Sequence, residues 1–510
     1  MGLNALDLVI IAFYLAGITL FGLRFRKKDR SLKDYFLADR NIPWWAISLS
    51  IVAAETSTLT IISVPGLAFD ANFGFLQLVF GYLVGRVIIS FVLLPHYFRG
   101  DLFTAYQLMD RRFGPRLRSL TAGLFLITRA AAEGVRVFAV AIVVGIALSS
   151  MLSGLGDFGR DVASIAIVTA LTLVYTFEGG MAAVIWTDVI QMLIYVAGTI
   201  VGVFTLLHHV PGGWETIHTV AAAHGKFRVF DFSFDFWKTY TFWSGLIGGA
   251  FLTTASHGTD QLIVQRLLAA RNETQSKLAL LSSGVFVLFQ FTLFLLIGAM
   301  LYVFYRYLGN PIAVTRADRI FPTFIVTEMP HGVSGLLIAA ILAAAMSNLS
   351  AALNSLSSSS IVDFYLRRRP NTPEQRRIFL SRAVTIIWGL VLFSLAIISR
   401  RGGRVVEVGL SIASVAYGAL LGVFLLGVLT KRATESGAMV GFFVGFVFNL
   451  YIWQEQNIWD HLAPLLHFSW KLPHGVPFTW YVMIGSLVTF AVGYVCSIFA
   501  GRGKPGTVHG

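Results

Sequence analysis

Polar and ionisable side chains occur inside apolar stretches at several places in this sequence. The segment AAETSTLT, residues 53–60, places Glu55 and four hydroxyl side chains ahead of Pro65 and Gly66. This crowding predicts an interrupted helix, because unwound backbone at membrane depth is tolerated where it lines a cavity, and its carbonyls can then bind a cation. The alternative is a kink in which serine and threonine hydroxyls bond back to the backbone, with Glu55 paired elsewhere.

A second polar segment, TRAAAEGVR, spaces Arg129, Glu133 and Arg136 at i, i+4 and i+7. At this spacing the three side chains share one helix face. One arginine can neutralise Glu133 and leave the other for a substrate carboxylate or for Glu55, but a closed structural ion-pair network explains the same pattern.

Two single residues within apolar stretches are further candidates. Asp188, in GGMAAVIWTDVIQ, can help bind a cation or cap a neighbouring helix end. His257 follows in ASHGTDQLIVQR, where a hydrogen-bonded packing role is the simpler explanation for a lone histidine. Ionisable side chains in membrane spans are functional candidates because leaving them unpaired costs free energy.

The stretch AAAMSNLSAALNSLSSSS, residues 343–360, carries many hydroxyl and amide groups in an otherwise apolar segment. Ala344, Ser347 and Asn348 follow i, i+3, i+4, and Ser350 continues beside them. An oxygen-lined helix face suits a hard monovalent cation, much as oxygen ligands suit calcium and magnesium. Small and hydroxylated residues also let helices pack closely, so spacing alone leaves both interpretations open.

The elements that must position these residues are transmembrane helices. The chain has 510 residues, of which 56% are hydrophobic and 13% charged, whereas soluble domains are about a quarter charged. Windows of about 20 apolar residues predict an all-α polytopic membrane protein with about thirteen helices. The expected spans are 4–23, 43–66, 72–97, 119–150, 161–177, 182–208, 238–266, 276–307, 331–365, 378–399, 405–429, 434–453 and 478–500.

Lysine and arginine orient this stack. The loops after odd-numbered spans and the C-terminal end hold 24 of the 39 basic residues, and the opposite side holds 11. The positive-inside rule then predicts an outer N-terminus and a cytoplasmic C-terminus, in the cell inner or plasma membrane. The net charge of +13 is thus a topology signal and does not indicate nucleic-acid binding. The single cysteine excludes internal disulfides and cysteine-based metal sites.

Several motifs together resemble those of one known family, the sodium:solute symporters, over nearly the whole chain. They are SLKDYFLADRNIPWWAISLSIVAAETSTLT, GGMAAVIWTDVIQ, TDQLIVQRLLAAR, AAAMSNLSAALNSLSSSSIVDFY and GVFLLGVLTKRATESGAMVG. The resemblance implies one transporter domain over 1–510, with a LeuT-like core of two inverted five-helix repeats, 43–208 and 238–429, and additional helices in 434–500. It also implies broken helices at the second and seventh spans and transport by alternating access.

The resemblance also implies a sodium site between the second and ninth spans. Its ligands, carried over by position, are the backbone carbonyls of Ala53, Thr56 and Ala344 and the side chains of Ser347 and Asn348. Asn348 stands where the family usually has serine or threonine, so its longer side chain changes the geometry of the site.

Some family members hold a second sodium ion near the aspartate of the sixth span. Here that site involves Asp188, Ser347 and Ser350. The next hydroxyl position is Ala351, and this loss favours one sodium per transport cycle.

Solute contacts are implied at three positions of the second span, Glu55, Ser57 and Thr60. Other candidates lie nearby in the expected fold: Gln77, Arg129, Arg136 and His257. Sugar transporters of the family carry asparagine at the Glu55 position and an aromatic residue near His257, so a sugar is disfavoured. A buried Glu55 suits a cationic or polyhydroxyl solute, whereas the arginines suit a carboxylate, as in the sialic-acid and monocarboxylate branches of the family. The expected solute is a small organic anion or another small polar metabolite.

The predicted function is sodium-coupled uptake of a small polar organic solute. The expected partners are the solute and the lipid bilayer, without nucleic acid and without an obligate protein partner. No HExxH, GxSxG or Walker A motif occurs, so an enzyme is not expected. The alternatives are a transporter-like solute sensor and proton-coupled uptake through Glu55 or Asp188.

Overall fold

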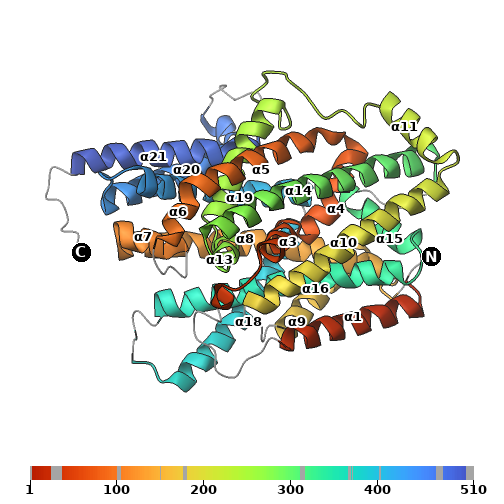
Figure 1. The fold of residues 1–510 in the computed structure, drawn as a ribbon, viewed down its shortest axis with the longest axis horizontal. Helices are drawn as coiled ribbons and strands as arrows, with labels where there is room; N and C mark the ends of the chain where they lie inside the picture. Colours follow the sequence, from red (N-terminus) through yellow and green to blue (C-terminus); the bar gives the residue numbers. More distant parts are fainter. Residues whose placement is uncertain are drawn as a thin grey trace.

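The chain folds as a bundle of long helices in a computed structural model, which describes residues 3–24, 37–99, 105–149, 151–175, 181–310, 316–365, 369, 371–400, 404–466 and 475–500. Most helices run along the long axis of the bundle, with α1 at one edge and α20 and α21 at the opposite edge (Figure 1). The start of α1 and the end of α21 lie at opposite ends of that axis. Within the described part there is no β-strand, and one parallel bridge pairs Ile42 with Ala270.

The first half of the chain supplies thirteen of the named elements. They are α1 (Ala5–Leu23), η1 (Ala38–Arg40), α3 (Trp44–Glu55), α4 (Thr58–Asp70), η2 (Phe73–Phe75), α5 (Leu76–Ile88), η3 (Ile89–Leu93), α6 (Leu94–Phe98), α7 (Ala105–Phe113), α8 (Pro115–Ala147), α9 (Asp157–Tyr175), α10 (Met181–His209) and α11 (Gly213–Ala223).

The second half continues with elements of the same kind. They are η4 (Ser244–Gly248), α12 (Gly249–Gly258), α13 (Gln261–Leu268), α14 (Glu273–Leu301), η5 (Tyr302–Tyr307), η6 (Ala317–Arg319), α15 (Ile320–Thr327), α16 (Val333–Ser359), η7 (Ser360–Tyr365), α18 (Glu374–Ser399), α19 (Val405–Leu429), α20 (Glu435–Leu466) and α21 (Phe478–Ala500).

The helices are long and apolar enough for a membrane. In the described ranges nine of them meet a length and composition criterion for spanning, or ten if α3 and α4 form one span. The other three expected spans coincide with α1, with α9 and with the interrupted segment η4–α12–α13, so the count of thirteen stays a prediction. Several of the basic loop residues that orient the chain, including those after residue 500, lie outside the described residues.

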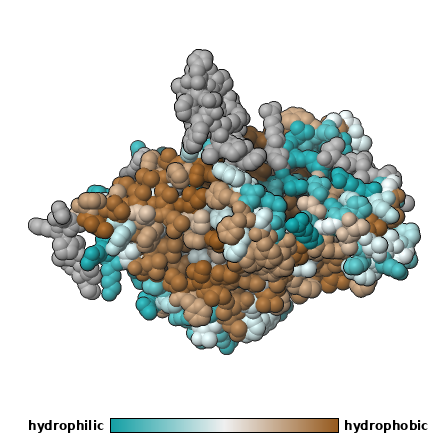
Figure 2. All heavy atoms as spheres, turned by 90° about the horizontal axis from the view of Figure 1, so that it is seen from above, coloured by the Kyte–Doolittle hydropathy of each residue, from teal (hydrophilic) through white to brown (hydrophobic). Residues whose placement is uncertain are grey.

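The outer surface is apolar where lipid is expected. Phe13, Phe379 and Phe499 have exposed fractions of 76%, 70% and 77%. Figure 2 shows a broad band of hydrophobic side chains over one face, with hydrophilic side chains gathered towards one end. An apolar surface of this extent is stable only against lipid or another protein.

Small residues bring the helices into close contact. A Cβ atom on Gly81 of α5 would lie 2.3 Å from the carbonyl oxygen of Gly245, so the backbones of α5 and η4 touch. At the other side of the bundle, Asp7 of α1 accepts hydrogen bonds from the amides of Gly332 (2.6 Å) and Gly335 (3.1 Å). Asp7 thereby satisfies free amides at the first turn of α16 and holds the helix that carries the expected sodium ligands.

Two of the helical segments are interrupted. α3 and α4 meet at a break and are bent by 65°, which confirms the interruption predicted from the crowded hydroxyls. The seventh expected span is interrupted as well, at Thr259 and Asp260 between α12 and α13. The Asp260 side chain caps α13 by accepting from the amide of Leu262 at 2.9 Å.

Candidate functional site

The break between α3 and α4 leaves backbone carbonyls without partners. The Thr56 amide still donates to Val52 O at 2.7 Å, but the Ser57 amide turns to Glu55 O at 2.9 Å. Ser57 is extended, with ψ 170°. As a result, no amide of the described residues donates to the carbonyl oxygens of Ala53 or Thr56. These are the two carbonyls of the second span that the sequence assigns to sodium.

The start of α4, the middle of α8 and the middle of α16 meet at one pocket. Its polar lining is formed by Ser57 and Thr58 of the break, Glu133 and Arg136 of α8, and Asn348 of α16. Its apolar lining consists of Val137, Val140, Ala345 and Leu349. The cavity volume of about 20 Å³ matches roughly one water molecule or one small ion. The fold therefore brings together three residues, from three separate spans, that the sequence singled out: Ser57, Arg136 and Asn348.

The other expected sodium ligands lie close by in the chain. Ala344 and Ser347 precede Asn348 on α16; Ala344 is buried and Ser347 is partly buried. The Thr56 hydroxyl donates to Gln290 Oε1 of α14 at 2.7 Å. This bond holds the Thr56 side chain against α14. That these five residues form one coordination shell stays a prediction.

On the charged face of α8, Glu133 forms ion pairs with the arginine one turn before it and with the arginine one turn after it. Arg129 Nη2 lies 2.9 Å from Glu133 Oε1, and Arg136 Nη1 donates to the same oxygen at 2.7 Å. Arg129 also faces Asp260 at 3.9 Å, and the Tyr417 hydroxyl donates to Asp260 at 2.9 Å. The shared face predicted from the spacing is confirmed. Arg136 differs from Arg129 because 32% of its side chain is exposed, against 9%.

Glu55 and His257 belong to a different cluster, beside α5. Arg86 Nη2 donates to Glu55 Oε2, and His257 Nε2 lies 3.4 Å from the same oxygen. Arg86 is completely buried and also donates through Nε to Ser283 at 3.0 Å. The Glu55 charge is thus satisfied within the protein, and neither Glu55 nor His257 lines the pocket at the break. Thr60 lies next to this cluster, with its hydroxyl 3.3 Å from the carbonyl oxygen of Glu55.

Gln77 forms hydrogen bonds at the first turn of α5. Its amide nitrogen donates to the carbonyl oxygens of Gly74 (3.1 Å) and Tyr240 (3.3 Å), and its Oε1 accepts from the Asp231 amide at 2.9 Å. This side chain joins α5 to the segment between α11 and η4, and it does not line the pocket.

Asp188 is paired with an arginine. Arg266 Nη2 of α13 donates to Asp188 Oδ2 at 2.9 Å, and the Ser50 hydroxyl donates to the same oxygen at 2.7 Å. Arg266 also donates through Nε to Ser50 at 2.9 Å, which closes a buried triangle between α3, α10 and α13. Among the described hydrogen bonds none joins Asp188 to Ser347 or Ser350, so the second cation site stays a prediction. Sequence reasoning missed both Arg266 and Arg86 because their partners are distant in the chain.

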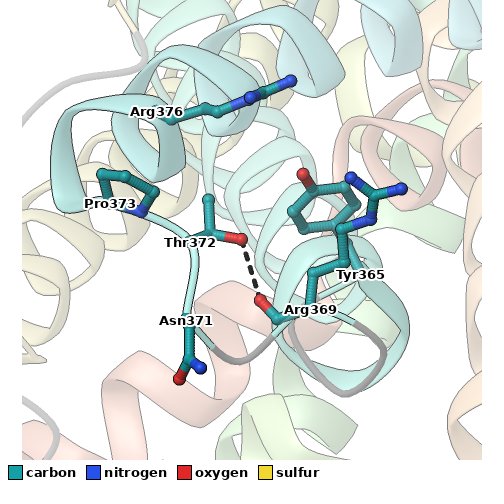
Figure 3. Close-up of a pocket in the computed structure, with 6 residues that line it drawn as sticks. All are labelled: Tyr365, Arg369, Asn371, Thr372, Pro373 and Arg376. Atoms are coloured by element: carbon teal, nitrogen blue, oxygen red, sulfur yellow. Dashed lines mark hydrogen bonds between the residues drawn. The ribbon is translucent and has the colours of Figure 1, made fainter.

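A larger cavity of about 340 Å³ lies away from all of these residues, at the turn between η7 and α18 (Figure 3). It is lined by Tyr365, Arg369, Asn371, Thr372, Pro373 and Arg376. The Thr372 hydroxyl donates to the Arg369 carbonyl at 2.8 Å and shapes the turn. Because this cavity lies in a basic loop and contains none of the expected ligands, its size does not make it the transport site.

Comparison with known proteins identifies the class of this fold. The sodium:solute symporter family model matches residues 35–445. The chain is 29% identical to the sodium/sialic acid symporter SiaT of Proteus mirabilis, over 87% of this chain and 88% of that protein. It is 24% identical to the human sodium-coupled monocarboxylate transporter 2, over 97% of this chain and 84% of that protein.

Solved structures agree with the sequence matches. A substrate-bound, outward-open Na⁺-coupled sialic acid symporter superposes with a TM-score of 0.76 at 26% identity, covering 97% of this chain and 98% of that one. Mhp1, a nucleobase-cation-symport-1 family transporter, shares the fold alone, with a TM-score of 0.54 at 14% identity. This chain belongs to the sodium:solute symporter family. It is a membrane transporter with sodium as its coupling ion, and it is not an enzyme.

Proposed function

We propose that this protein carries a small organic anion into the cell together with one sodium ion. The observation that supports an anion is the pocket in which the Arg136 side chain meets the first turn of α4. Amides of Thr58 and Leu59 have no carbonyl partner in the described part of the chain. Free amides and the helix dipole favour negative charge at such an end, and half-helix ends receive anionic groups in transporters of this architecture.

Arginine supplies the second half of the anion site. The Arg136 guanidinium is partly exposed, and its contact with Glu133 uses one of its five N–H groups. The remaining donors suit a carboxylate, which arginine binds in a bidentate fork. Glu55 does not oppose such a ligand, because Arg86 neutralises it within the neighbouring cluster.

Sodium is proposed to bind beside this site, at the carbonyls of Ala53, Thr56 and Ala344 and the side chains of Ser347 and Asn348. The free carbonyls at the break support this assignment. Because Asn348 is also part of the pocket lining, an ion at these ligands fixes the pocket wall. Sodium then strengthens solute binding, and by thermodynamic reciprocity the solute strengthens sodium binding.

Alternating access is proposed to use two inverted repeats, 43–208 and 238–429, with the N-terminus outside and the C-terminus in the cytoplasm. The two observed interruptions support this division, because each falls in the first span of its repeat. Movement of the second repeat against the first then exposes the pocket to either side in turn.

Sodium-dependent uptake of different solutes tests the solute class. Purified protein in liposomes is given an inward sodium gradient and three groups of solutes: short carboxylates, neutral sugars and cationic amines. We expect uptake of the carboxylates, lost when choline replaces sodium. Uptake of sugars or amines instead would refute the anion assignment. Uptake that follows a pH gradient without sodium would favour the proton-coupled alternative, and solute binding without uptake would favour a sensor.

A further inference from the structure

One oxygen of the Glu133 carboxylate has no partner. Arg129 and Arg136 both contact Oε1, while Oε2 is buried and accepts no hydrogen bond from the described residues. The side chain as a whole is 1% exposed. A buried acceptor of this kind costs free energy unless a donor arrives, so an orphaned carboxylate oxygen needs an explanation.

The position of Glu133 explains why one of its oxygens lacks a donor in the described part of the chain. Its side chain lines the pocket at the break together with Arg136, Ser57, Thr58 and Asn348. It is thus the one acidic side chain among the lining residues of the proposed anion site. Neither Asp188 nor Glu55, which the sequence singled out as membrane carboxylates, lines this pocket.

The charges around Glu133 decide which donor fits. Arg129 and Arg136 both lie within 3 Å of Oε1, and Arg129 also faces the Asp260 carboxylate at 3.9 Å. A cation bound at Oε2 would therefore be repelled by these two nearby guanidinium groups. A hydroxyl group on an anionic solute avoids this repulsion because it is neutral, and the solute's own carboxylate offsets the arginines.

We propose that Glu133 Oε2 accepts a hydrogen bond from a hydroxyl group that the solute carries next to its carboxylate. This inference rests on the proposed anion transport and narrows it to 2-hydroxy acids. Arg136 and the first turn of α4 bind the carboxylate, and Glu133 recognises the substituent beside it. A solute without the substituent leaves Oε2 unsatisfied, and sites of this type discriminate strongly against such analogues.

Matched pairs of probes test this inference on the unmodified protein. Lactate and propionate differ only at C2, as do mandelate and phenylacetate. The measurement is the half-saturating concentration of each probe in sodium-driven uptake by liposomes, with thermal stabilisation in sodium as a second readout. We expect the hydroxylated member of each pair to bind at least about 10-fold more tightly, as one hydrogen bond to a charged group implies.

The variant Glu133→Gln then assigns the preference to this residue. It should reduce the ratio within a pair towards one, because it weakens the substituted member more than the plain carboxylate, whereas a merely structural role would weaken both members equally. Glu215→Gln, at the exposed helix α11, is the matched control and should keep the ratio. Equal affinities in the unmodified protein, or an unchanged ratio in Glu133→Gln, would overturn the inference. Sodium-driven uptake of neutral or cationic solutes alone would instead refute the anion transport on which it rests.

Discussion

Replacing Arg86 by methionine should be one of the most damaging single changes in the bundle. Arg86 is 0% exposed, and Glu55, its ion-pair partner, has a side chain that is only 11% exposed. Removing one member of a buried pair leaves an uncompensated charge, which typically costs about 3–5 kcal/mol. The lost bond to Ser283 Oγ adds to this cost. We therefore expect Arg86→Met to lower the free energy of unfolding by about 3–5 kcal/mol.

The assay is equilibrium unfolding in mixed detergent micelles. The double variant Glu55→Gln/Arg86→Met removes both charges and should recover most of the lost stability, because deleting a buried pair together is often nearly neutral. Arg271→Met is the control, since Arg271 is exposed and bonds only to Asn41 in the described structure. Surface changes of this kind stay within about 0.5 kcal/mol. If Arg86→Met behaved like Arg271→Met, Glu55 would not be neutralised by Arg86, and its exclusion from solute binding would be wrong.

Two further predictions concern sodium binding and the loop after α11. Ser347→Ala should raise the sodium concentration for half-maximal uptake about 10-fold, because a lost contact worth about 1.4 kcal/mol changes affinity by that factor. The control Ser355→Ala, two turns further along α16, should leave this concentration unchanged. Equal effects of the two substitutions would show that both serines serve helix packing. In the loop after α11, burial lowers the pKa of Lys226 to about 8, and its ammonium donates to the carbonyls of Phe69 (2.6 Å) and Ala71 (3.0 Å) at the end of α4. Since the unfolded lysine holds its proton to about pH 10.4, this group makes folding less favourable below pH 8, and the penalty disappears as pH rises from about 8 to 10. Thermal stability of the wild type should therefore rise over that interval relative to Lys226→Met, and parallel profiles would show that Lys226 is not the group.

The features that sequence predicted well are local. The interruption after Glu55 follows from adjacent hydroxyl residues that compete for backbone hydrogen bonds, and the shared face of Arg129, Glu133 and Arg136 follows from helical periodicity. Both are properties of segments shorter than ten residues, and the structure confirms both.

The features that it missed depend on tertiary contacts. Glu55 finds Arg86 from another span, and Asp188 finds Arg266, whose sequence position gives no sign of the pairing. A carboxylate in a membrane span is a functional candidate because burying it without a partner costs free energy. Sequence alone does not locate a distant partner, so a paired carboxylate is mistaken for a ligand. Glu133 shows the reverse. Its close arginines suggested a satisfied ion pair, and only the structure shows that one of its oxygens accepts no hydrogen bond from the described residues.

The central claim is that one sodium ion moves with one organic anion, and the charge carried per cycle tests it most directly. Liposomes with an inward sodium gradient are clamped with potassium and valinomycin at 0 or −100 mV, and accumulation of radiolabelled carboxylates, including lactate and mandelate, is measured. One sodium ion and one monovalent anion together carry no net charge, so the transport cycle is electroneutral. Accumulation should therefore require sodium and be the same at both potentials. Each net positive charge would instead contribute about 2.3 kcal/mol at −100 mV, roughly a 50-fold change in the accumulation ratio. A change of that size, or accumulation that does not need sodium, would contradict the account.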